Sequence, residues 1–352
     1  MTYVSACRET AAHLASKESV RILALETSCD ETAAAIVENG RSIISNVVFS
    51  QIDLHALYGG VVPEIASRAH VEACDRVIDQ ALTEANMTLS QIDALAVTHG
   101  PGLVGALLTG VSCIKGLAYA ASLPLIPVNH IEGHVSANYL SHMDLKPPFL
   151  CLVVSGGHSH LIQVKDYGVY HLLGQTQDDA AGEAFDKAAR VLDLPYPGGP
   201  RLDKLAEEGN PFAFSLPRPH PEGRYDYSFS GLKTAFINGA HKLNQQGKPL
   251  PKADMAAAFR MAVVSSLCEK ALLAAKETNA PALALAGGVS ANSLLRRMMQ
   301  EQCDSAGIPL YMPRLSLCTD NAAMIASAAY YRLLRGEIAD LSLNAQPALR
   351  LV

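Results

Sequence analysis

Arg21-Ile-Leu-Ala-Leu-Glu-Thr-Ser-Cys-Asp-Glu31 is the stretch that decides the fold. Its apolar beginning predicts a β-strand, and the segment Ser28-Cys-Asp-Glu31 predicts a turn. A second apolar run, from Thr32 to Val37, predicts a returning strand. The expected product is a β-hairpin whose tip carries hydroxyl groups and the carboxylates of Asp30 and Glu31.

The same pattern returns in the second half of the chain. Phe149–Val154 is an apolar strand, Ser155-Gly-Gly-His158 is a turn, and residues 159–164 form a returning strand. We interpret the two hairpins as an internal repeat, which predicts two similar α/β halves facing a common cleft.

Glycine-rich turns follow three apolar strands, at residues 100–105, 155–158 and 287–290. Glycine lets a backbone approach a phosphate closely, and its N–H groups can donate to phosphate oxygens. Taken singly, each of the three segments could instead be an ordinary tight turn with no ligand. Together they favour a nucleotide site in an α/β fold. Helices are expected at 61–85, after the 100–105 turn through Ala121, at 181–192, from near Arg201, at 231–243, at 253–278, from near Asn292 and at 321–335.

Composition limits the function further. The 352 residues carry a net charge of −6, so tight unaided binding of nucleic acid is not expected. Eight scattered cysteines without a C-x-x-C pair indicate reduced thiols in a cytoplasmic protein. By our count no apolar run reaches the ~18 residues of a membrane span. Residues 1–20 lack an apolar signal core and predict a short helical or frayed extension.

His130 and His134 follow an apolar strand at residues 125–128. On a helix, side chains four residues apart share a face, so both imidazoles could reach one cation such as Fe, Zn, Ni or Cu. Solvated or core-satisfied histidines are the alternative. Asp320, just before an Ala-rich helix, could be a third ligand or the N-cap of that helix. If Asp320 is a ligand, Thr319 could serve as the N-cap instead.

Two further acids have structural alternatives. Asp186 could form a surface ion pair with Arg190, and Asp203 could be a first-turn helix acid. In the functional interpretation, both accept hydrogen bonds from ligand hydroxyl or amine groups.

From about residue 21 to 340 the chain resembles the bacterial TsaD family, whose archaeal and eukaryotic counterparts belong to the KEOPS complex. The segments that carry the resemblance are Glu26-Thr-Ser-Cys-Asp-Glu-Thr32, Gly60-Val-Val-Pro-Glu-Ile-Ala-Ser-Arg-Ala-His70, Gly100-Pro-Gly-Leu-Val-Gly105, Asn129-His-Ile-Glu-Gly-His134, Val154-Ser-Gly-Gly-His158, Gly182-Glu-Ala-Phe-Asp-Lys187, Tyr196-Pro-Gly-Gly-Pro200, Phe229-Ser-Gly-Leu-Lys-Thr234 and Gly287-Gly-Val-Ser-Ala-Asn292.

The resemblance implies a two-lobed actin/Hsp70/sugar-kinase fold, with a nucleotide cleft between duplicated RNase H-like halves. The first lobe would comprise residues 21–134 and 322–352, the second residues 135–321, and residues 1–20 would be an extension of unknown role. The implied enzyme is an acyltransferase. It moves the threonylcarbamoyl group from threonylcarbamoyl-adenylate to the exocyclic amine of the adenosine 3′ of the anticodon, in tRNAs reading codons that start with A, and releases AMP.

The resemblance also assigns residues and partners. The metal, Fe(II) with Zn as an alternative, would be held by His130, His134 and Asp320. The substrate-binding positions would be Val153, Val154, Ser155, Gly156, Gly157, Asp186, Gly199, Asp203 and Asn292. The implied partners are tRNA, a catalytically silent paralogue of the same fold (TsaB) in a heterodimer, and a P-loop ATPase (TsaE), with no membrane involved.

An adenine amine is a poor nucleophile, so the carbonyl must be activated. A divalent cation could polarise it, and Asp30 or Glu31 is the candidate general base for the amine proton. In the alternative, these carboxylates only orient a ligand.

Three rival functions remain at the sequence level. A metallopeptidase would need a Glu directly after the first histidine, where Ile131 stands, and Glu132 lies about 100° further round a helix. A small-molecule kinase of the same superfamily would prefer Mg and oxygen ligands over paired histidines. A silent scaffolding paralogue would not need His130, His134 and Asp320.

Overall fold

The structure is a computed structural model that describes residues 3–218 and 221–352. The chain forms two compact units, one of residues Met1–Leu145 and Thr319–Val352, the other of Lys146–Cys318. The lobe boundaries expected from the sequence, 134/135 and 321/322, lie elsewhere. Helix α5 (His130–Ser141) continues past residue 134 and packs against α11 (Ala322–Leu334), which keeps both helices in the first unit.

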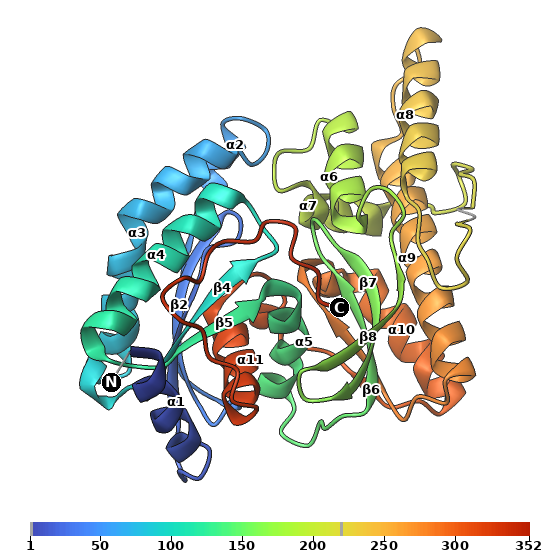
Figure 1. Cartoon of the computed structure of the whole chain (residues 1–352). Helices are drawn as coiled ribbons and strands as arrows, with labels where there is room; N and C mark the ends of the chain where they lie inside the picture. Colours follow the sequence, from blue (N-terminus) through green and yellow to red (C-terminus); the bar gives the residue numbers. More distant parts are fainter. Residues whose placement is uncertain (1–2, 219–220) are drawn as a thin grey trace. The chain divides into compact units, whose positions relative to one another are not determined.

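The first unit contains a five-stranded sheet in the order β3-β2-β1-β4-β5. β1, β2 and β3 are antiparallel neighbours, whereas β4 and β5 run parallel to β1. Figure 1 shows α3 and α4 along this sheet, with α11 and α5 nearby. The bounds are β1 Arg21–Glu26, β2 Glu31–Glu38, β3 Ser42–Ser50, β4 Ala94–Gly100, β5 Leu125–Asn129, α1 Tyr3–Leu14, α2 Ile52–Ala56, α3 Pro63–Glu84 and α4 Val104–Ala121.

Strand periodicity explains how this unit builds its core. Leu23 and Leu25 of β1 point to the same face and pack with Val77 of α3 and with Val111 and Ile114 of α4. Helix α11 packs against β1, β2 and β5. Both faces of β1 are therefore covered, which is why its four inner residues, Ile22 to Leu25, are all apolar.

The second unit repeats this topology. Its sheet has the order β10-β9-β6-β7-β8, in which β6, β7 and β8 are antiparallel neighbours and β9 and β10 continue in parallel from β6. Read from its other edge, this order is β8-β7-β6-β9-β10, which corresponds strand for strand to β3-β2-β1-β4-β5 of the first unit. The predicted duplication is therefore confirmed. The bounds are β6 Phe149–Val154, β7 Ser159–Asp166, β8 Val169–Gln175, β9 Leu283–Ala286, β10 Leu310–Tyr311, α6 Ala181–Val191, α7 Gly198–Leu205, α8 Ser230–Gln245, α9 Lys252–Glu277 and α10 Ser293–Ala306.

The N-terminal segment is helical, as expected, and it is packed rather than frayed. Helix α1 buries Cys7, Ala11 and Leu14, and the Tyr3 hydroxyl donates to the Leu123 carbonyl at 2.7 Å. These contacts dock α1 onto the first unit.

Helix α4 corrects one expectation. In the part of the chain that the structure describes, it is the one helix long and apolar enough by length and composition to cross a membrane. Lys115 is its single charged residue, so our count from the sequence was wrong. Leu107, Val111 and Ile114 on one side of α4 are buried in the first unit's own core.

Candidate metal centre

The two histidines are positioned by the start of α5. The Asn129 side chain caps this helix, because its Oδ1 accepts from the backbone N–H of Ile131 at 2.9 Å and of Glu132 at 3.4 Å. The helix therefore begins at His130 and places His134 one turn later on the same face. Both side chains are buried.

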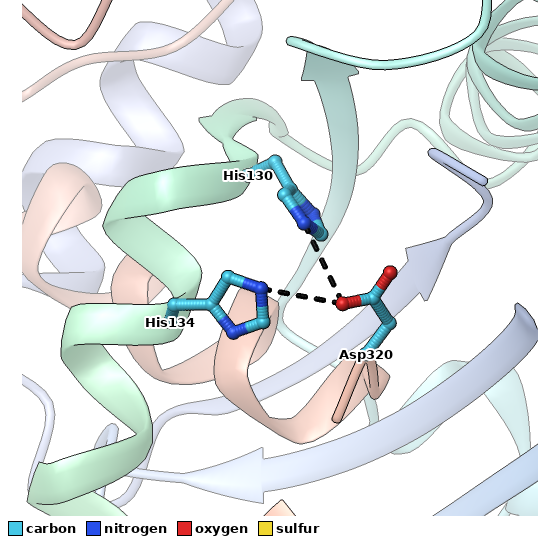
Figure 2. Close-up of side chains that lie close together, drawn as sticks. All are labelled: His130, His134 and Asp320. Carbon is cyan, nitrogen blue, oxygen red and sulfur yellow. Dashed lines mark ion pairs between the residues drawn. The ribbon is translucent and has the colours of Figure 1, made fainter. Parts of the chain in front are cut away.

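Asp320 lies directly before α11, but it does not cap that helix. The N-cap is Asn321, whose side chain accepts from Met324 N at 3.0 Å, so both capping alternatives, Asp320 and Thr319, were wrong. Asp320 Oδ1 lies 3.2 Å from His134 Nε2 and 3.5 Å from His130 Nε2, as Figure 2 shows. The candidate ligand atoms of all three residues lie within 4.8 Å of one another.

The cluster has the chemistry of a metal site. His134 is fully buried, and neither ring nitrogen makes a hydrogen bond to a described residue, although Nε2 lies 3.2 Å from Asp320 Oδ1. Leaving a buried polar atom unsatisfied is costly, and a cation between the imidazoles and the carboxylate would satisfy Nε2, the His134 nitrogen that faces Asp320. Two imidazoles and one carboxylate are a donor set that suits Fe(II) and Zn and leaves coordination positions open.

The electrostatics agree with this interpretation. Burial lowers the pKa of His130, but the carboxylates of Asp320 and Glu26 more than offset it and raise the pKa to about 9. The cluster thus attracts positive charge, which a proton supplies when no cation is bound.

A second layer of polar groups lies behind His130. Glu26, the last residue of β1, is completely buried, and its Oε2 lies 3.4 Å from His130 Nδ1. Ser28 Oγ lies 3.1 Å from the same nitrogen. Sequence reasoning missed both roles; the available signal was a carboxylate ending an otherwise apolar strand.

Asp30 and Glu31 lie at the tip of the first hairpin, as predicted. Glu31 Oε1 accepts from Ser50 Oγ at 2.9 Å, whereas its Oε2 is buried with no hydrogen-bond partner among the described residues. Burial, with smaller contributions from the charges of Asp30 and Asp320, raises the pKa of Glu31 to about 8. The Asp30 carbonyl accepts from Gln51 N at 3.0 Å and helps to fix the tip.

In the second unit, the Ser155–His158 turn follows the buried residues Val153 and Val154. Gly156 and Gly157 are exposed, and their backbone N–H groups donate to no atom of the described residues. Close packing supports the turn from below, because a Cβ on Gly182 would lie 2.6 Å from the Ser155 carbonyl oxygen. The turn therefore presents two free N–H donors on a rigid base.

The remaining predicted binding residues form two pairs in the second unit. Asp186 Oδ1 accepts from Gly198 N at 2.9 Å and Gly199 N at 3.0 Å, so it holds the start of α7. Asn292 Nδ2 donates to Asp203 Oδ1 at 2.9 Å. Asp203 is not a first-turn acid, because α7 begins at Gly198.

Arg260 and Ser293 complete the surroundings of Asp203. The buried Arg260 guanidinium donates to Asp203 Oδ1 at 2.8 Å, and Ser293 N donates to Oδ2 at 2.9 Å. Asn292 in turn caps α10 by accepting from Leu295 N at 3.0 Å. Both carboxylate oxygens of Asp203 are thus engaged by the protein itself.

Glu132 is not arranged as a peptidase base. Its carboxylate is buried and accepts from Arg332 Nη1 at 2.7 Å. Two basic residues of the second unit are also engaged, since Arg224 pairs with Glu277 and Lys233 pairs with Asp179. Neither is a free cation for phosphate binding.

Known proteins were compared with the chain. Residues 42–327 match the TsaD family, described as tRNA N6-adenosine threonylcarbamoyltransferase. Proteins of that name from Clostridium perfringens and Clostridium botulinum are 54% and 52% identical to the chain; the matches cover 94% and 95% of this chain and 98% and 99% of theirs.

Solved structures with similar folds are distant in sequence. Component A of the Acidaminococcus fermentans (R)-2-hydroxyglutaryl-CoA dehydratase has a TM-score of 0.54 at 14% identity, covering 90% of this chain and 99% of that chain. Full-length HypF has a TM-score of 0.60 at 14% identity, covering 89% of this chain and 46% of that one. With the repeated sheet order, they confirm the two-lobed actin/Hsp70/sugar-kinase fold class. On the similarity over nearly its whole length, the chain belongs to the TsaD family of tRNA N6-adenosine threonylcarbamoyltransferases.

Proposed function

We propose that this chain transfers a threonylcarbamoyl group from threonylcarbamoyl-adenylate to the exocyclic N6 amine of the adenosine 3′ of the anticodon, in tRNAs reading codons that start with A. Membership of the family supports the activity. The observation that carries the proposal for this chain is the buried cluster of His130, His134 and Asp320, which a silent paralogue or a magnesium-dependent kinase would not require.

The reaction is an acyl transfer with balanced bonds. The N6–carbonyl bond forms, the carbonyl–O bond of the mixed anhydride breaks, and AMP leaves with that oxygen on its phosphate. N6 loses one proton. Since AMP is a good leaving group, the reaction needs no covalent enzyme intermediate.

His130, His134 and Asp320 would hold one Fe(II) ion, with Zn as the alternative. Imidazole and carboxylate donors fit either ion, so the residues alone do not select between them. When bound, such a cation would polarise and orient the threonylcarbamoyl carbonyl.

The second unit would bind the adenylate. The free N–H groups of Gly156 and Gly157 are suited to a phosphate or to a developing oxyanion. Asp186 would act mainly by fixing the backbone at Gly199, and Asp203 by fixing the side chain of Asn292, because their carboxylates already accept these hydrogen bonds. Of the remaining positions, Ser155 would bind through the backbone of the same turn, and Val153 and Val154 would contribute the end of β6 that leads into it.

Glu31 is our candidate for the general base, and Asp30 is the alternative. The unpartnered Oε2 of Glu31 can accept a proton, and a pKa of about 8 lies near the working pH, where general bases are effective. If Glu31→Gln and Asp30→Asn each leave the transfer rate unchanged at saturating substrate, neither carboxylate is the base.

Partners follow from the family and from the chain's acidity. With a net charge of −6, tight binding of tRNA would need the silent paralogue TsaB, the ATPase TsaE, or both. The face of α3 and α4 is our candidate surface for the paralogue, because Val71, Val104 and Leu108 are exposed there. A separate enzyme would supply the adenylate, and a cytoplasmic location would match the tRNA substrate.

The test is a transfer assay with purified threonylcarbamoyl-adenylate and unmodified tRNA, run with and without TsaB and TsaE. We expect one AMP for each modified adenosine and a dependence on the partners. ADP formed from ATP and a small-molecule acceptor, with no modified tRNA, would instead establish the kinase function. No product from metal-loaded protein with the full partner set would contradict the transferase.

A further inference from the structure

Glu26 is a carboxylate at the end of an apolar strand. It follows Leu25 in β1 and is completely buried. Burying an ionised carboxylate is costly unless charges and hydrogen bonds compensate. The surroundings of Glu26 supply both.

Three elements contribute these contacts. Ser28 N donates to Glu26 Oε1 at 2.6 Å, and the Thr98 hydroxyl of β4 donates to Oε2. Oε2 also lies 3.4 Å from His130 Nδ1 at the start of α5. The parallel register pairs Leu25 with Val97, so the sheet itself places Glu26 beside Thr98.

The two nitrogens of the His130 ring face different carboxylates. Nδ1 faces Glu26 and Ser28, whereas Nε2 lies 3.5 Å from Asp320. When a proton on Nδ1 is shared with Glu26, the lone pair of Nε2 is free on the side of Asp320 and His134. A carboxylate that accepts from a ligand's second nitrogen fixes its tautomer and raises its basicity.

We propose that Glu26, held by Thr98, is a positioning residue that orients His130 as a metal ligand without binding the metal itself. This inference rests on the metal site of the proposed function. His134 has no comparable support, because its Nδ1 lacks a hydrogen-bond partner among the described residues. The two histidines are therefore inequivalent, and Glu26 acts on one of them.

The experiment is a Zn²⁺ titration in competition with a chromophoric chelator, with Co²⁺ absorption spectra as a second readout. For Glu26→Gln, we expect Zn²⁺ affinity to fall 10- to 100-fold and the Co²⁺ bands to shift. Glu38→Gln is the matched control, since Glu38 pairs with Arg21 at the other end of the same β1–β2 ladder. It should bind Zn²⁺ like the wild type.

Variants of Thr98 test the same proposal if Glu26→Gln does not fold. Thr98→Val removes the donated hydrogen bond and should weaken Zn²⁺ binding several-fold, whereas Thr98→Ser keeps the hydroxyl and should restore it. Folded Glu26→Gln or Thr98→Val protein with wild-type affinity and spectra would overturn the positioning role.

His130→Ala, measured in parallel, separates this proposal from the metal site. Zn²⁺ lost in His130→Ala but unchanged in Glu26→Gln would refute only the role of Glu26. Wild-type binding by His130→Ala would refute the metal site and the inference that depends on it.

Discussion

At the scale of single residues, the two neighbours Asp320 and Asn321 before α11 have different roles, so that the Asp320 carboxylate is not used as a helix cap. Asn321 caps the helix, so the neighbouring Asp320 carboxylate can face His130 and His134. A carboxylate committed to a helix N-terminus could not serve both roles fully.

Gly182 is a residue whose missing side chain shapes the second unit. A Cβ there would lie 2.6 Å from the Ser155 carbonyl oxygen and 2.8 Å from Gly156 Cα. We predict that Gly182→Ala displaces the Ser155–His158 turn, lowers stability by about 1–3 kcal/mol and reduces transfer at least tenfold. Urea unfolding and the transfer assay would measure these effects.

Gly231 in α8 is the matched control, because a Cβ there would meet no atom within 4 Å. Gly231→Ala should be neutral or slightly stabilising. Equal behaviour of the two variants would contradict a role for close packing beneath the turn.

Glu31 predicts a dependence of stability on pH. Its pKa is raised to about 8, above the value near 4.5 expected in the unfolded chain, so the folded state holds the proton more strongly. Glu31 therefore makes the free energy of unfolding fall as pH rises from about 5 to 8. The free energy of unfolding of Glu31→Gln, relative to that of the wild type, should therefore rise by more than about 1 kcal/mol across this range. Urea titrations at pH 5.5 and 8.5 measure it, and a pH-independent difference would count against the raised pKa.

The sequence predicted some of these residues better than others. The spacing of His130 and His134 indicates a shared face on its own, because helix geometry is local. Asp320 could be either a ligand or a helix cap until the family resemblance assigned it, since 185 residues separate it from His134. Glu26 was missed because its partners, Thr98 and His130, come near only through the order of the strands.

At the scale of elements, α5 and α11 hold the candidate ligands in register. The buried Glu132 carboxylate accepts from Arg332 of α11, and Arg332 also pairs with Glu337. We predict that Glu132→Gln lowers the free energy of unfolding by about 2 kcal/mol and weakens Zn²⁺ binding. The control is Glu64→Gln, which breaks an exposed pair with Arg68 and should cost under about 0.5 kcal/mol. Equal losses would mean that the Glu132–Arg332 pair contributes no more than a surface pair.

The edge strands β3 and β8 were among the elements that sequence patterns did not predict. The chain was expected to form two-stranded hairpins, but β3 and β8 extend each hairpin to three strands. Both strands are partly exposed, and polar residues such as Ser45, Asn46 and His171 interrupt their apolar pattern. Pairing with a buried neighbour, rather than their own composition, makes them strands.

At the scale of the whole molecule, one topology used twice supports two different chemical environments. In the first unit, the residues after β5 and before α11 supply two imidazoles and a carboxylate suited to a cation. In the second, the residues after β6 supply free backbone N–H groups suited to a phosphate. Sequence periodicity predicted the duplication, whereas the identity of the substrate came only from similarity to known proteins.

The most direct test of this account measures bound metal and threonylcarbamoyl transfer in the same samples of wild type and His134→Ala, with TsaB, TsaE and purified adenylate present. The account predicts that wild type carries one metal ion per chain and modifies tRNA, and that His134→Ala, although folded, loses both together. Metal-free His134→Ala protein that modifies tRNA at the wild-type rate would contradict it.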